Sequence, residues 1–313
     1  MSISKEIERL QKAKKDIGDA IVRKGGSVSG TIDTYAKSVM ALGDVSFRTA
    51  IDIVNKSDAK NVDLTMISPR NETDFTKLFF ENYNLVSVDV SNWDTSKVTD
   101  FTQAFSKTHN LESIDVRNFN TGNCVNFFAM FDEGYKISAL DVSKWNTSNA
   151  ENMDWIFCRC SSLTTLDVSK WNTSKVTNMG HMFMICSSLT TLDLSGFDTS
   201  NVTNMLSMFY GCTSLATLDV SNFDMTNVEN VKTMFIGDIK LSEVKCDGMK
   251  LPNIDLKNIR LNDCPLTVDS IVGLLNALPQ SDKGYSFQIG SNNIAKLSDE
   301  QKAIATDKGW TLI

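Results

Sequence analysis

The chain has 313 residues, a formal net charge of −7 and 42% hydrophobic residues, the composition of an ordinary globular protein. The acidic balance, without a basic stripe, disfavours nucleic acid as a partner, and no apolar run approaches the roughly 18 residues that span a membrane. Only two histidines are present, which removes most general-base and zinc chemistry. We therefore expect no nucleic-acid binding, no membrane insertion, no metal and no cofactor.

The first segment comprises residues 1–45. Its residues 4–24 carry apolar residues at alternating spacings of three and four, with Lys14 among them. This spacing predicts an amphipathic helix with a short heptad seam. Such a helix either packs on its own chain or serves in anchoring and oligomerisation, with a homo-oligomer such as a trimer as one expected form. The candidate residues for anchoring and oligomerisation are Ile3, Ile7, Leu10, Ile17 and Ile21.

A glycine-rich loop at residues 24–30 follows, and apolar residues on one face of residues 31–42 predict a second helix. The whole stretch Ile3–Leu42 contains the elements Glu-Ile-x-Arg-Leu-Gln-x-Ala-Lys and Ile-Asp-Thr-Tyr-Ala. It resembles the N-terminal module of many phage tail and fibre proteins. The resemblance implies that this segment contacts other virion proteins.

From about residue 60 to residue 250 the sequence repeats itself every 26 residues. A fixed period of this length is typical of a solenoid, in which a unit buries its apolar face only against its neighbours. We assign residues 46–250 to this array. The asparagines, 27 in all and none among the first 50 residues, recur because each coil reuses the same turns. The period is clearest in the aromatic column Trp93, Phe119, Trp145, Trp171, Phe197 and Phe223.

A single unit can be interpreted from residues 163–186. Leu166 and Val168 alternate with polar residues, which predicts a short half-buried strand. Asn172-Thr-Ser174 has the composition of a turn. Apolar residues spaced three or four apart between Val176 and Cys186 predict a short helix. Neighbouring strands of successive coils are then expected to pair in parallel.

The unit Leu-x-x-Leu-Asp-Val-Ser-x-Trp/Phe resembles the 26-residue bacterial surface protein repeat, the BspA-like branch of the leucine-rich repeats. Trp171 occupies the position where a typical leucine-rich repeat has asparagine. The fold class expected is an α/β solenoid: a leucine-rich-repeat-like, right-handed stack of strand–turn–helix coils with a parallel sheet, a helical N-terminal segment and an α/β C-terminal cap.

Residues 251–313 are expected to form that cap. Thr267 can begin a helix that runs through Leu274 to Leu278, and residues 285–289 alternate as a strand. Residues 298–301 form a capping box that opens a second helix, and residues 310–313 predict a closing strand. This region would cover the open edge of the sheet.

The aspartate column on the outward strand face is the main candidate binding site. Stacked about 5 Å apart, such carboxylates repel one another unless they are satisfied. They are satisfied either by hydrogen bonds from the adjacent turn and its hydroxyls, or by a bound cation or a basic or polyhydroxylated ligand. The candidate ligand-binding residues are Asp115, Asp141, Asp167, Asp193, Asp219, Thr165 and Ser169.

Two other columns and the two histidines favour structural interpretations. The Trp/Phe column is interpreted as core rather than a sugar-stacking platform. Cys160, Cys186 and Cys212 are expected to be free buried thiols rather than disulfides. His109 and His181 occupy unlike repeat positions, and no partner constellation is expected for them.

No catalytic arrangement emerges, so we expect a protein that is not an enzyme. The leading hypothesis is a bacteriophage virion structural protein, a tail or head fibre, whose solenoid recognises a glycan or protein on the host cell surface. Its expected location is the virion, with synthesis in the host cytoplasm because the first residues lack a secretory signal. The alternatives are a BspA-like adhesin on the bacterial cell surface and a purely structural virion spacer.

Overall fold

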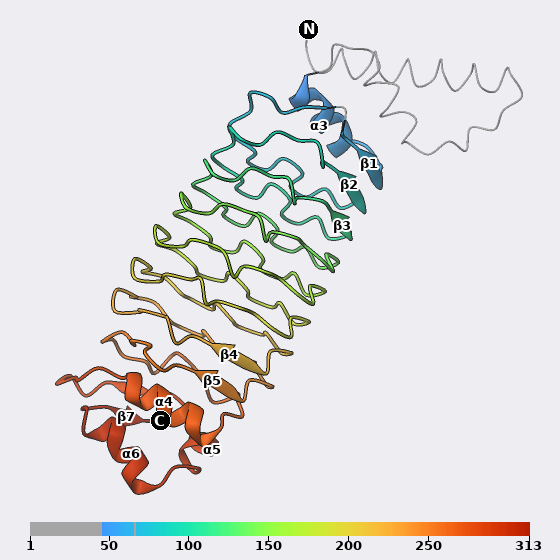
Figure 1. Ribbon diagram of the computed structural model, residues 1–313. Coiled ribbons are helices and arrows are strands. Elements are labelled where there is room, and N and C mark those ends of the chain that lie inside the picture. Colours follow the sequence, from blue (N-terminus) through green and yellow to red (C-terminus); the bar gives the residue numbers. More distant parts are fainter. Residues whose placement is uncertain (1–45, 66) are drawn as a thin grey trace, which may run out of the picture.

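The computed structural model describes residues 46–65 and 67–313, which form an elongated stack of coils (Figure 1). Helix α3 lies at one end of the stack and helices α4, α5 and α6 lie at the other. The five apolar residues predicted to anchor or oligomerise the N-terminal segment lie outside the described residues. In chain order the elements are α3 (Phe47–Asn55), β1 (Asn61–Asp63), β2 (Ser87–Asp89), β3 (Ser113–Ile114), β4 (Thr217–Asp219), β5 (Glu243–Lys245), α4 (Val268–Ala277), β6 (Ser286–Phe287), α5 (Ser291–Ile294), α6 (Asp299–Thr306) and β7 (Thr311–Leu312).

Strands of successive coils pair in parallel at both ends of the stack, as predicted, but residues 163–169, from which a strand was predicted, and the equivalent residues of the two neighbouring coils form no strand. Val62 of β1 pairs with Val88 of β2, which pairs with Ile114 of β3, so each step is one repeat. Strands β4 and β5 pair in the same register. A second column of parallel bridges runs along another side of the coils and joins Asp74, Asp100, Asn126, Asn152, Asn178, Asn204 and Asn230. The right-handed sense of the stack stays a prediction.

The third side of each coil contradicts the prediction of a short helix. Met179, His181, Phe183 and Ile185 each donate their backbone N–H to a carbonyl oxygen of the next coil at 2.7–3.0 Å. His181 and Ile185 have φ values of +54° and +58°, which lie far from the helical value near −63°. A helix is about 10 Å across and stacks on the roughly 4.8 Å step between paired strands only when the array curves into a horseshoe. Turns that bond to the next coil follow that step in the nearly straight stack seen here (Figure 1).

We call this third side the turn ladder. It consists of residues 75–84 and of the equivalent residues in each following coil, up to residues 231–240. Its inward positions are spaced three or four apart, so they reproduce the apolar pattern of a helix without helical backbone. Within each coil, consecutive turns close by hydrogen bonds between residues three apart, such as Cys186 N–H to Phe183 O at 3.1 Å.

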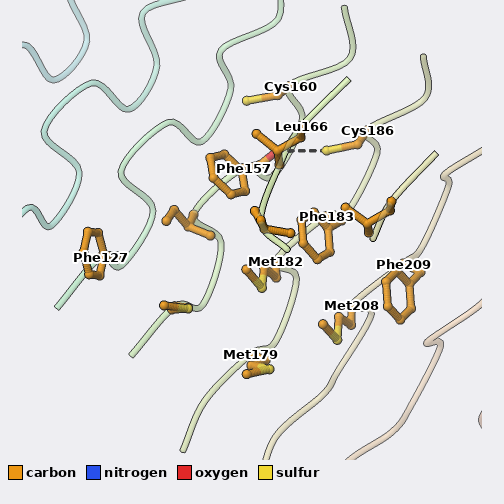
Figure 2. Packing of buried hydrophobic residues seen from close by; sticks show 14 of the residues in the cluster. Phe127, Phe157, Cys160, Leu166, Met179, Met182, Phe183, Cys186, Met208 and Phe209 are labelled. Atoms are coloured by element: carbon orange, nitrogen blue, oxygen red, sulfur yellow. Dashed lines mark hydrogen bonds between the residues drawn. The ribbon is translucent and has the colours of Figure 1, made fainter. Parts of the chain in front are cut away.

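Aromatic columns fill the space between the three sides. The phenylalanine rings from Phe79 to Phe235 succeed one another with centroids 5.4–6.1 Å apart, one ring per coil. Figure 2 shows Phe157, Phe183 and Phe209 of this column, with Met182 and Met208 beside them. These rings are at most 4% exposed and each packs on the rings of the neighbouring coils, so the core is continuous along the stack and a coil buries its apolar face only against its neighbours.

Polar side chains are buried at the corner after each strand because the next coil satisfies them. The hydroxyl of a threonine in each corner donates to a carbonyl oxygen of the following coil at 2.8–3.1 Å. The indole N–H of Trp93, Trp145 and Trp171 donates to a carbonyl oxygen of the preceding coil at 3.1–3.2 Å. The threonines are Thr95, Thr121, Thr147, Thr173 and Thr199.

Both ends of the stack are covered. At the N-terminal end, Phe47 of α3 stacks on Phe75, and the side chain of Asn55 donates to the carbonyl oxygen of Leu78 at 2.7 Å. At the C-terminal end, α4 begins after Thr267, whose side chain accepts the N–H of Ser270. The capping box at the start of α6 and the strands β6 and β7, which pair in parallel, are also present. The predicted elements of the C-terminal cap are therefore confirmed.

Candidate binding surface

The outward strand face forms a shallow groove along the stack. One stretch of about 790 Å³ is lined by residues from Asn61 to Asp141. A second stretch of about 780 Å³ is lined by residues from Ala139 to Asp219. The two stretches share residues 139–141, so the groove is continuous over the coils from β1 to β4. The aspartates that line it are Asp63, Asp89, Asp115, Asp141, Asp167, Asp193 and Asp219.

Each carboxylate of this column accepts a hydrogen bond from its own turn. One oxygen of each aspartate accepts the backbone N–H of the residue two positions later, at 2.9–3.2 Å. The hydroxyls of Ser143 and Ser169 donate to Asp141 and Asp167 at 2.7 Å. The expectation of local hydrogen bonding is confirmed, and it explains how like charges tolerate stacking.

The same hydrogen bonds keep part of the column ionised. The Ser143 hydroxyl lowers the pKa of Asp141, and the Ser195 side chain lowers the pKa of Asp193. Arg117 lowers the pKa of Asp115 by donating from Nε and Nη2 at 3.0 and 2.8 Å. At neutral pH these carboxylates are therefore negative, and Arg117 neutralises one of them in place.

The remaining candidate residues lie on the same face. Thr165 and Ser169 line the second stretch of the groove on either side of Asp167. Thr165 is exposed, whereas Ser169 is half-buried and bonded to Asp167. The structure thus brings together the residues predicted to bind a ligand, although their binding role stays a prediction.

The Trp/Phe column belongs to the core, as predicted, since its rings are at most 4% exposed. The cysteines are free and buried, also as predicted. The thiols of Cys160, Cys186 and Cys212 donate to carbonyl oxygens of the preceding coil, one of which is drawn in Figure 2. Burial raises the pKa of these three thiols far above the ordinary value.

The prediction that the histidines lack partners is wrong. His109 Nε2 lies 2.8 Å from Glu133 Oε2, and His181 Nδ1 lies 3.0 Å from Asp154 Oδ1. The His181 ring also stacks on Trp155 with centroids 4.1 Å apart. These partners come from neighbouring coils, 24 to 27 residues away in sequence, and a search for local motifs does not find them. Alignment of the coils at the 26-residue period would have found them.

Within residues 46–65 and 67–313, no group of three or more His, Cys, Asp or Glu side chains is placed to hold a metal ion. No helix in the same residues is long and apolar enough to cross a membrane.

The fold and the groove together define a leucine-rich-repeat-like solenoid with an acidic strand face. The family described as "Mycoplasma protein of unknown function, DUF285" matches residues 49–165 and 134–245, and the chain belongs to this family. None of the curated proteins matches the sequence.

Two solved structures were compared with this chain and are similar to it over most of its length. One is the crystal structure of the TLR13–ssRNA13 complex, at 10% identity and a TM-score of 0.24, with 80% of this chain and 46% of that chain covered. This chain thus spans less than half the length of TLR13. The other is the leucine-rich-repeat protein LIC12759 of Leptospira interrogans, at 9% identity and a TM-score of 0.15, with 84% of this chain and 97% of that chain covered.

Proposed function

We propose that the chain is a non-enzymatic recognition protein whose strand face binds a basic or polyhydroxylated ligand on a host cell surface. The observation that carries the proposal is the continuous groove with its column of aspartates. Because equivalent groups recur at every coil, a linear or repeated ligand makes several weak contacts at once, and their sum gives useful affinity.

The setting we propose is the virion of a bacteriophage, as a tail or head fibre. The sequence of residues 3–42, which resembles phage tail and fibre modules, supports this setting, since such a segment would attach the solenoid to other virion proteins. The second candidate is an adhesin on the bacterial cell surface, supported by the resemblance of the coils to the bacterial surface protein repeat. A spacer without a ligand is the third.

The test replaces Asp115, Asp141, Asp167 and Asp193 together by asparagine. Asparagine retains the turn, because Asn146 and the equivalent asparagines at the next corner of the coil already accept the same N–H bond. The change therefore removes charge without removing structure. We expect the virion to adsorb to host cells at least tenfold more weakly, and the remaining adsorption to depend less on salt concentration.

The matched control replaces Asp94 and Asp198 by asparagine, because these aspartates occupy the corner position where other coils carry asparagine. Adsorption should not change. Unchanged adsorption of the variant with all four aspartates replaced would exclude the strand face as the receptor-binding surface. Labelling of the protein on intact bacteria but not on virions would favour the adhesin.

A further inference from the structure

The first coils of the turn ladder carry aromatic side chains that the stacking of coils does not require. In the next three coils the equivalent position is occupied by a serine or threonine, whose hydroxyl donates to a carbonyl oxygen of the preceding coil, as Thr213 does to Ser187 at 3.2 Å, and the last coil carries Ile239. A small hydroxyl side chain is therefore sufficient for the fold at this position. Three successive coils depart from it, and the residues that they carry are Tyr83, His109 and Tyr135.

These three rings form a row along the stack, at the surface. The centroids of Tyr83 and His109 are 4.8 Å apart, and those of His109 and Tyr135 are 5.0 Å apart. Tyr83 is 46% exposed, and the side chain of His109 is 35% exposed. The bond from His109 to Glu133 fixes the central ring. The row is thus accessible and held in place before any ligand binds.

A column of alternating charges lies beside the rings. Lys107 pairs with Glu81 at 2.8 Å, and Arg159 lies 3.5 Å from Glu133. All four residues have φ between +58° and +60°, the region that favours glycine. Two later coils use glycine at this position, as in Gly211. Positive φ at this position is common to all coils, and the fifth coil carries the apolar Ile185 there, so the backbone does not require a charge. The charged side chains are confined to the first four coils, beside the rings.

We propose that this patch, made of the rings of Tyr83, His109 and Tyr135 and of the charged column Glu81, Lys107, Glu133 and Arg159, binds a neutral glycan chain that runs along the axis of the stack. Aromatic rings pack against the C–H faces of sugars, and carboxylate and guanidinium groups hydrogen-bond to their hydroxyls. The ion pairs within the charged column leave it without net charge, so it does not select an acidic polymer.

The spacing of the row favours a linear polymer over a protein. The coils advance by about 4.8 Å, close to the length of one sugar ring, so successive sugars meet equivalent side chains. A row one side chain wide offers less surface than the roughly 800 Å² that each partner buries in a stable protein interface. The patch lies on a different side of the coil from the strand-face groove, and the inference does not rest on the proposed function.

The experiment measures binding of the full chain to immobilised neutral oligosaccharides of two to eight sugars, based on glucose, mannose, galactose and N-acetylglucosamine. Chondroitin sulfate is the acidic comparison. The wild-type chain should bind at least one neutral series, with affinity that rises with length to about the number of coils in the patch. The triple variant Tyr83→Ser, His109→Ser and Tyr135→Ser, which copies the later coils, should bind at least tenfold more weakly.

Two controls separate this site from the rest of the surface. Ser187→Ala with Thr213→Ala changes the same column outside the patch, and Asp198→Asn removes a carboxylate at the corner where other coils carry asparagine; both should leave glycan binding intact. If the triple variant does not fold, Tyr83→Ser alone, at the most exposed ring, should still weaken binding several-fold. Failure of the wild-type chain to bind every neutral series overturns the proposal, as does equal binding by a folded triple variant or a preference for chondroitin sulfate.

Discussion

A buried carboxyl group, Asp238, makes the stability of the stack depend on pH. It occupies the column in which the preceding coils carry Cys160, Cys186 and Cys212, and it is 1% exposed. Its Oδ1 accepts the N–H of Cys212 at 2.8 Å, while its buried Oδ2 has no hydrogen-bond partner among the described residues. Burial, assisted by the nearby charge of Asp263, raises the pKa of Asp238 to about 8.

The sign of the effect follows from proton linkage. The folded chain holds the proton of Asp238 more tightly than the unfolded chain, whose aspartate has the ordinary pKa of 3.8. The stabilisation is complete below that value and is lost as pH rises towards about 8, at roughly 1.4 kcal/mol per pH unit. Between pH 5 and pH 8 the loss approaches about 4 kcal/mol, an upper limit because local opening of the coil admits water.

The perturbation is Asp238→Asn, which does not titrate and places an amide donor where Oδ2 lies unpartnered. We expect the free energy of unfolding of the variant, relative to wild type, to rise by at least 2 kcal/mol from pH 5 to pH 8. The assay is urea denaturation at each pH, followed by fluorescence of the buried tryptophans. Asp141→Asn is the control: the pKa of Asp141 is lowered by Ser143, so both states are ionised above pH 5 and its difference from wild type should stay constant. Parallel curves for wild type and Asp238→Asn would refute the reasoning.

Three further predictions concern the core and the turn ladder. The Thr173 hydroxyl donates to the carbonyl oxygen of Asp198 and accepts its N–H, both at 2.8 Å, so Thr173→Val should lower the free energy of unfolding by about 1–3 kcal/mol; a loss no larger than that of Thr173→Ser in urea denaturation would contradict this. Ile185 is β-branched at φ +58°, so Ile185→Gly should raise the melting temperature and Gly211→Ile should lower it; the opposite order in calorimetry would show that side-chain packing outweighs backbone strain. All seven cysteines are buried and free, so an aromatic disulfide reagent at pH 8 should titrate none in the native chain and all seven in denaturant; rapid native labelling would contradict the buried thiol column.

Features that depend on local chemistry or on the repeat could be predicted from the order of the residues. The 26-residue period predicted parallel stacking in register. Alternation around Leu166 and Val168 predicted the face with its exposed aspartates, although these residues alternate in burial without forming a strand. The cap at Thr267 was predictable because its hydrogen bond joins residues three apart. The local satisfaction of the aspartates was predictable for the same reason, since each bond reaches only the next turn.

The conformation of the third side of the coil, and the side chains that meet on it, depend on contacts between coils and could not be predicted in this way. Inward residues three and four apart fit both a helix and the turn ladder. A positive φ is suggested by the sequence only where the residue is glycine, so the positive φ of Arg159 and Ile185 could not be predicted. The step between stacked coils, set by parallel backbone hydrogen bonds, selects turns over helices. That same step brings His109 to Glu133 and aligns the ring row, because contacts between coils join residues about one repeat apart, beyond the range of any local pattern.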